Sequence, residues 1–209
     1  MDTSNPLRSV TPTVDADVLL VLARTAAPLT GARVAVLAER SYGQVRAVLH
    51  RLVEHGLVDV QSHGNAYSYT LNRAHVAAAA VERLSGAAEE VERRIEARVA
   101  GWNPSPCAVV LFGSFARREG DVGSDLDLLL VRPSAIDEDE PRWRSARYEL
   151  VRDAEAWSGN RVQIIELSED EVVEAARAGE PLIAAVHDEG VVLFGRPLRE
   201  LLREAAGDR

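Results

Sequence analysis

One segment in the second half of this 209-residue chain constrains its fold most. It begins with the apolar run Cys107–Phe112, which predicts a buried strand, and Gly113-Ser114 follows directly. Asp125 and Asp127 stand two residues apart at the start of a second apolar run. Because side chains alternate along a strand, both carboxylates are expected on one face, with leucines on the other, buried face. The later elements alternate between helix and strand, which favours an α/β arrangement on a small mixed sheet.

The polar residues of this segment predict a phosphate and metal site. Gly113 and Ser114 lie where a strand passes into a helix, so free backbone N–H groups and a hydroxyl meet at a positive helix end. Asp125 and Asp127 repel each other unless a cation lies between them, and Mg²⁺ prefers one or two carboxylates plus substrate phosphates. The alternative is that the two aspartates form a solvated strand edge and Gly-Ser an ordinary turn.

The segment resembles the GS-x-AR-G…SD-x-D-L signature of the polymerase-β-like nucleotidyltransferase superfamily, especially its minimal bacterial branch. The matching residues are Gly113, Ser114, Ala116, Arg117, Ser124, Asp125, Asp127 and Leu128. The resemblance implies transfer of a nucleoside monophosphate from an NTP to an acceptor, with release of pyrophosphate. It implies Mg²⁺ or Mn²⁺ on the two aspartates and nucleotide contacts from Gly113, Ser114, Arg117 and Ser124. Minimal members of the superfamily often belong to toxin–antitoxin pairs. For this chain, the resemblance implies such a pair only by analogy.

Two positions depart from the family pattern. The family places a third carboxylate on a later strand, where this chain has Gln163, and an amide is a weak metal ligand and no base. Glu166 is near, but strand parity places it on the opposite face unless a bulge turns it inward. The acidic loop Asp137–Glu140 is another possible donor. Arg118 stands where the family commonly has glycine, and we expect it to contact phosphate or face water.

The first 75 residues predict a separate module. Its expected elements are a helix from Val14 that stops at Pro28, a short helix capped by Thr30, a third helix capped by Ser41 and ended by Gly56, and strands over 57–60 and 66–71. Three helices and a hairpin in this order indicate a winged helix-turn-helix. The pattern resembles MarR- or ArsR-like bacterial regulators, which implies DNA binding, mostly as a dimer.

The third helix carries most residues of the DNA-binding hypothesis. The candidates, chosen as donors for base edges and phosphates, are Tyr42, Gln44, Arg46, His50 and Arg51 in the helix, His63 in the wing, and Arg73 after it. Glu54 and Asp59 weaken the basic face, so binding should be modest and sensitive to salt. The alternative is that this module docks another protein.

The distribution of charge differs between the first 75 residues and the rest of the chain. Residues 1–75 hold seven arginines and six acidic residues, which leaves 17 basic and 27 acidic residues in 76–209. We therefore predict an α+β two-domain protein. Its parts are a flexible tail over 1–13, a winged helix-turn-helix domain over 14–74, a linking helix over 75–103 and a nucleotidyltransferase domain over 104–209. The apolar stripe of the linking helix is either a homodimer seam or a face that packs on the following domain.

Composition narrows the function further. The net charge of −9 argues against non-specific nucleic-acid binding by the whole molecule. One cysteine, no secretory pattern at the start and no apolar run of about 20 residues indicate a cytoplasmic protein without a membrane partner. The expected partners are an NTP, DNA, and an acceptor that is a protein side chain, a tRNA end or a small molecule. Three hypotheses remain: an active transferase, a non-catalytic regulator that senses nucleotide, and an interaction module.

Overall fold

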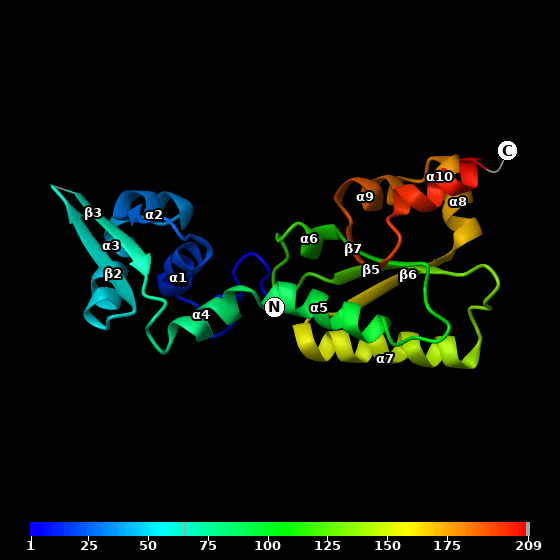
Figure 1. The fold of residues 1–209 in the computed structure, drawn as a ribbon, viewed down its shortest axis with the longest axis horizontal. Coiled ribbons are helices and arrows are strands. Elements are labelled where there is room, and N and C mark those ends of the chain that lie inside the picture. Colours follow the sequence, from blue (N-terminus) through cyan, green and yellow to red (C-terminus); the bar gives the residue numbers. More distant parts are fainter. Residues whose placement is uncertain (65, 208–209) are drawn as a thin grey trace. The chain divides into compact units, whose positions relative to one another are not determined.

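The computed structural model describes residues 1–64 and 66–207, and its contacts divide the chain into two compact units. The N-terminal unit comprises residues 4–88 with Asp2, and the C-terminal unit comprises 89–209 with Met1 and Thr3. Each unit combines helices with one small sheet, so the chain is of the mixed α+β kind (Figure 1). The division at Ala88 falls inside the segment expected to be a single linking helix.

The N-terminal unit combines four α-helices with a three-stranded antiparallel sheet, and α4 packs on α1 rather than on the sheet. The helices are α1 Val14–Arg24, α2 Gly31–Leu37, α3 Tyr42–Glu54 and α4 Ala78–Ser85, and the strands, in the order β1-β3-β2, are β1 Leu29–Thr30, β3 Ala66–Leu71 and β2 Val58–His63. The Thr30 and Ser41 side chains accept the N–H groups of Arg33 and Gln44, which confirms both predicted caps. Strand β1 was not predicted, because two residues are too few for a periodicity to show.

The segment 1–13 is folded, and the prediction of a flexible tail is wrong. Residues Pro6–Ser9 form a 3-10 helix, η1, and Leu7 is only 2% exposed within the core of the N-terminal unit. Asp17 of α1 explains much of this order. Its carboxylate is 4% exposed and accepts hydrogen bonds from Arg8 and from Asn5, at 2.7 and 2.9 Å.

Asp17 also fixes the connection between α2 and α3. Arg40 lies in that connection and donates from Nε to Asp17 Oδ2 at 2.6 Å. Burial alone would raise the pKa of Asp17, but the hydrogen bonds from Arg40 and Arg8 outweigh it and hold the pKa below its usual value. One buried carboxylate therefore joins the N-terminal segment, α1 and the turn before α3.

The segment expected to be one helix over 75–103 forms two helices. These are α4 and α5 Ala87–Val99, and the break falls at Gly86, because glycine weakens the interior of a helix. The apolar stripe of α5, Val91, Ile95 and Val99, is at most 3% exposed in the single chain. The chain thus covers this stripe by itself, which favours packing over a dimer seam.

The C-terminal unit is built on a four-stranded sheet in the order β6-β5-β4-β7. Its strands are β4 Ala108–Phe112, β5 Leu126–Arg132, β6 Val162–Ser168 and β7 Val191–Gly195, and only the β5–β6 pair is parallel. Its other helices are α6 Gly113–Ala116, α7 Pro141–Ser158, α8 Glu169–Ala178, α9 Pro181–Glu189 and α10 Leu198–Gly207. Helices α5 and α7 cover one face of the sheet, while α8, α9 and α10 cover the other (Figure 1).

Strand β5 is central and buried on both faces, not on one as its leucines at alternate positions had suggested. Leu128 and Leu130 point to one face and Leu129 to the other, and none of the three has exposed surface. The aspartates therefore stand at one end of a strand whose middle, Leu128–Val131, is apolar and buried. Within residues 1–64 and 66–207, no helix is both long and apolar enough to cross a membrane.

Candidate functional site

The register of the sheet brings three predicted site residues together. Asp127 near the start of β5 lies opposite Phe112 of β4 on one side and opposite Gln163 of β6 on the other. Asp125 immediately precedes β5, and the Gln163 amide donates from Nε2 to Asp125 Oδ2 at 2.5 Å. Two carboxylates and one amide therefore meet at this end of the sheet.

The carboxylate pair carries negative charge that the surrounding protein does not balance. Burial, and secondly the charge of Asp125, raise the pKa of Asp127 above its usual value. Both aspartates remain partly accessible to solvent. A cation placed between them would offset the repulsion between the two carboxylates and favour the charged form of Asp127, so the pair is suited to hold one.

Gly113 allows the chain to approach this pair closely. Its φ of +71° lies in the left-handed region, and a Cβ added there would stand 2.6 Å from Asp127 Oδ2. Helix α6 begins at this residue, and Ser114 follows, half-buried, in its first turn. The Ser114 carbonyl accepts the N–H groups of Glu119 and Gly120, at 2.9 and 3.1 Å, which folds the next loop back onto α6.

We expect Gly113→Ala to damage both stability and the site. A side chain in the left-handed region costs about 1–2 kcal/mol, and the added carbon must also displace the Asp127 carboxylate. Urea unfolding measures the first effect, and Mg²⁺-dependent nucleotide binding measures the second. Gly43→Ala on α3 is the matched control, because a Cβ there meets no atom within 4 Å. Equal stability of the two variants would contradict the prediction.

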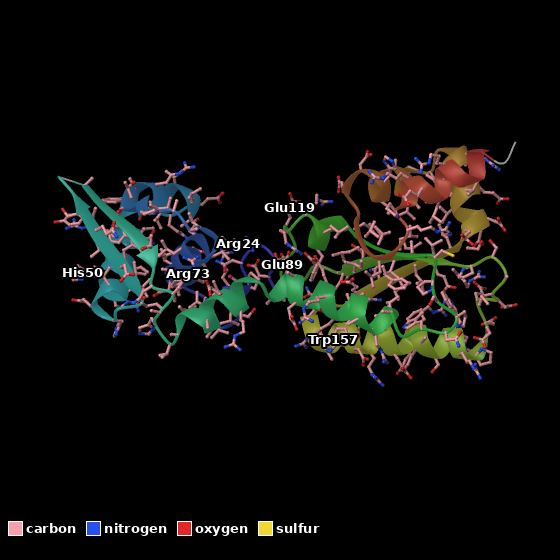
Figure 2. The ribbon with its side chains drawn as sticks, viewed as in Figure 1. Arg24, His50, Arg73, Glu89, Glu119 and Trp157 are labelled. Carbon is pink, nitrogen blue, oxygen red and sulfur yellow. The ribbon has the colours of Figure 1, made fainter. Side chains whose placement is uncertain are left out.

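The two arginines after α6 are both held by glutamates. Arg117 pairs with Glu119 at 2.8 Å and with Glu189 at 2.6 Å, and Figure 2 shows Glu119 beside α6. A phosphate contact from Arg117 would thus have to displace these carboxylates. Arg118 has a φ of +59°, a conformation that glycine adopts more easily, and it pairs with Glu92 of α5 at 2.6 Å. Arg118 therefore links the loop after α6 to α5. The sequence predicted that it would contact phosphate or face water, and neither description fits this ion pair.

Ser124 belongs to a tight turn before Asp125. Its hydroxyl accepts the N–H of Asp121 at 2.9 Å and donates to the Asp121 carboxylate at 3.0 Å. Asn160, only 3% exposed, donates from Nδ2 to the carbonyls of Asp121 and Ser124, at 3.1 and 2.9 Å. Thr3, fully buried, donates to the carbonyl of Gly120 at 3.0 Å. These bonds fix the loop that presents the carboxylates.

The sequence interpretation missed Asn160 and Thr3. The one local signal at Asn160 was its place directly after Gly159, whose left-handed conformation ends α7. Nothing near Thr3 in the sequence points to a partner 117 residues away. Both are supporting residues of the site rather than members of it.

Asn160→Ala should loosen the loop that ends at Asp125. Removal of the amide takes a donor from the carbonyls of Asp121, Ser124 and Met1 and an acceptor from the Met1 ammonium group, in a site that is 3% exposed, at an expected cost of about 1–3 kcal/mol. Amide hydrogen exchange over residues 117–125 should become faster than in the wild-type chain. If stability falls without faster exchange there, Asn160 acts elsewhere in the fold.

Neither alternative donor replaces the missing carboxylate. Glu166, 9% exposed on its side chain, accepts hydrogen bonds from Arg132 at 2.9 Å, from Trp143 Nε1 at 2.8 Å and from Arg147. The acidic loop 137–140 follows the far end of β5, and Glu140 caps α7 there. In the described part of the chain, no group of three or more His, Cys, Asp or Glu residues could hold a metal. The donors at the site are Asp125, Asp127 and the Gln163 amide.

The DNA-binding candidates of α3 fall into two groups. Tyr42, Arg46 and His50 are exposed, and together with Tyr67 and Tyr69 they line a groove of about 440 Å³ between α3 and the β2–β3 hairpin. Figure 2 shows His50 on this side of the N-terminal unit. All three are exposed and can meet a ligand, and His50 Nδ1 also lies 3.5 Å from Glu54 Oε1.

The remaining candidates have partners within the N-terminal unit. Gln44 accepts the Ser41 hydroxyl at 2.8 Å, and Arg51 pairs with Asp15. Arg73 pairs with Glu82 at 2.9 Å and donates to the Ala23 carbonyl at 3.3 Å, away from His50 (Figure 2). His63 ends β2, but its side chain lies outside the described residues, as does Asn65, which the sequence His63-Gly64-Asn65 predicts to lie in the turn of the hairpin.

Comparison with known proteins yields few matches. No family model and no curated protein matches the chain. The solved structures that are similar include a toxin–antitoxin crystal structure with AMP-PNP, at 19% identity, and a mutant of the toxin–antitoxin MntA-HpeT, at 17% identity. Each match covers 56% of this chain and 84% of the other, with a TM-score of 0.39. A likeness of this size assigns no function by itself.

Proposed function

We propose that the C-terminal unit is a nucleotidyltransferase-type domain that binds an NTP with a divalent cation. The observation that carries this proposal is the close packing of Gly113 against Asp127, at the point where a buried strand gives way to the short helix α6. The turn is suited to the phosphates, and the carboxylate pair to the cation. Asp125 and Asp127 would bind the metal, and Ser114 with the neighbouring backbone N–H groups would bind phosphate oxygens.

Mg²⁺ or Mn²⁺ fits the donor set. Both ions accept hard oxygen ligands, and Mg²⁺ is commonly held by one or two carboxylates together with substrate phosphates. The raised pKa of Asp127 supports the fit, because a cation removes the repulsion from Asp125 that contributes to it. When bound, the ion would neutralise charge on the transferred phosphate and on pyrophosphate.

The proposed reaction is transfer of a nucleoside monophosphate. A hydroxyl oxygen of the acceptor forms a bond to the α-phosphorus, the bond from that phosphorus to the β-phosphate oxygen breaks, and pyrophosphate leaves. The proton of the hydroxyl passes to water or to one of the two aspartates. The acceptor would be a protein side chain, a tRNA end or a small molecule with a hydroxyl group.

A non-catalytic nucleotide sensor is the second candidate. The observation that favours it is the hydrogen bond from Gln163 to Asp125, because the amide occupies a carboxylate oxygen and supplies no base. In this case the same site would bind NTP without turnover. The C-terminal unit would then report nucleotide to the N-terminal unit.

A transfer assay separates the two candidates. Each α-³²P-labelled NTP is incubated with the full chain, Mg²⁺ or Mn²⁺ and host-cell extract, and Gln163→Glu is run beside the wild type. Label transferred by the wild type supports the enzyme. Wild-type binding by calorimetry without transfer, together with transfer by Gln163→Glu, supports the sensor. Absence of NTP binding by both proteins would contradict the proposed site.

We also propose that the N-terminal unit is a winged helix-turn-helix domain that binds duplex DNA through α3. Support comes from the order of its elements and from the exposed face of α3 beside the hairpin, where Arg46 and His50 reach solvent. With few basic residues on that face, binding should weaken steeply as salt rises. Arg46→Ala should weaken binding to genomic DNA fragments, whereas Arg83→Ala on α4 should not. Equal effects would favour a protein-docking role instead.

A further inference from the structure

The C-terminal unit has an open sheet edge at β6 that the candidate site leaves unused. Among the strands described, β6 pairs with β5 alone. Leu126 N–H donates to the Arg161 carbonyl, so odd-numbered residues of β6 direct their backbone groups toward β5 and even-numbered residues direct theirs outward. The Glu155 side chain accepts the N–H of Val162 at 3.2 Å, which leaves the outward groups of Ile164 available to a new strand.

A groove between α7 and β6 reaches this strand at Ile164. Its volume is about 700 Å³, and its lining consists of Ile164 and the α7 residues Pro141, Arg144, Ser145, Arg147, Tyr148 and Val151. Tyr148 is 70% exposed, so its ring is accessible to an occupant of the groove. Apolar side chains next to free strand backbone are what an added β-strand requires: backbone pairing gives affinity, and side-chain pockets give selectivity.

The charge of the groove differs from that of its surroundings. Two arginines and no carboxylate line it among the described residues, although residues 76–209 as a whole are acidic. Arg144 is 60% exposed and pairs with Asp139 only at 3.7 Å, while Arg147 contacts Glu166 and remains 35% exposed. Complementary charge therefore favours an acidic occupant.

We propose that the β6 edge and the α7 groove bind an extended polypeptide segment rich in aspartate and glutamate. The segment would join the sheet as a fifth strand, with its backbone paired to Ile164. Alternate side chains would rest on Tyr148 and Val151, and its carboxylates would meet Arg144 and Arg147. Binding at this edge does not require nucleotide, so it is independent of the function proposed for Asp125 and Asp127.

Fluorescence anisotropy with the full chain tests this proposal. The probes are three fluorescein-labelled peptides of about ten residues, the length of a long strand. The first alternates glutamate with valine, the second has lysine for glutamate, and the third is the acidic peptide N-methylated at alternate residues. We expect binding of the first peptide only, with at least a tenfold preference over the N-methylated one, since about 1.4 kcal/mol of lost pairing gives that factor. Equal binding of the first and third peptides would overturn the proposal.

Variants of the chain locate the binding surface. Ile164→Pro removes the outward N–H without touching the β5 ladder, and we expect about tenfold weaker binding. Arg144→Glu and Tyr148→Ala are exposed changes that should also weaken it, by about fivefold each, even if the proline variant folds poorly. Arg177→Glu on α8, on the opposite face of the sheet, is the charge-matched control and should bind normally. If none of the three variants weakens binding, or if the chain is a stable dimer in light scattering that Ile164→Pro dissociates, the edge has a different occupant.

Discussion

Replacing Asp125 and Asp127 together by asparagine should reduce cation-dependent NTP affinity by at least about a hundredfold, because charge stabilisation by a bound ion is worth several kcal/mol. The fold should survive, since both side chains are partly accessible and repel each other in the free protein. Calorimetry with Mg²⁺ and a non-hydrolysable NTP measures the effect. Glu138→Gln, in the exposed loop at the far end of β5, is the control and should leave affinity unchanged. Undiminished binding by the double variant would place the nucleotide elsewhere.

The same site should depend on pH in a defined direction. Burial and then Asp125 raise the pKa of Asp127, so protons compete with the cation at a higher pH than at an ordinary aspartate, for which the pKa is about 3.9. Affinity for Mg²⁺·NTP should therefore fall as the pH drops through this raised value. Asp125→Asn removes one of the two causes and should move the midpoint to lower pH. A midpoint that stays in place would mean that burial alone sets the pKa of Asp127.

Asp17→Asn should strongly destabilise the N-terminal unit. It leaves the donors of Asn5, Arg8 and Arg40 without their charged acceptor. Loss of one partner from a buried pair costs about 3–5 kcal/mol, and since the two arginines are about two-fifths exposed and can be hydrated, we expect about 2–4 kcal/mol. Urea unfolding measures this loss. Asp59→Asn in β2, at an exposed position, should change stability by less than about 0.5 kcal/mol.

The pH dependence of stability gives an independent test of Asp17. Its pKa is lower in the folded than in the unfolded protein, so its contribution is complete above the unfolded value of about 3.9 and is lost as the pH falls through the folded value. The wild-type chain should therefore lose stability below about pH 4 more steeply than Asp17→Asn. Parallel curves for the two proteins would show that the aspartate is not charged in the folded state.

Local signals in the sequence predicted the elements well. The caps at Thr30 and Ser41, the strand before Gly113 and the position of Gln163 next to Asp127 all follow from residue types and strand parity, which depend on neighbours a few positions away. The side of β6 on which Glu166 lies was predictable for the same reason.

Partners that are distant in sequence were beyond prediction. No spacing rule links Thr3 to Gly120, or Asn160 to Ser124, because such pairs form only when the whole unit is folded. The order of the first thirteen residues depends in the same way on a buried carboxylate that the sequence does not distinguish from surface aspartates. Arg117 shows the same limit: its motif position predicts a phosphate contact, but no local signal indicates that it pairs with Glu189, 72 residues away.

Because Thr3 belongs to the C-terminal unit, dividing the chain between the two units separates residues of one unit. A fragment that begins at Glu89 contains all four strands of the larger sheet but lacks the residue that donates to Gly120. A protease that cleaves at Ala88 would therefore not release a complete C-terminal unit, since part of that unit remains on the other piece. Complementation between the two pieces, rather than the behaviour of either alone, is the appropriate way to study them.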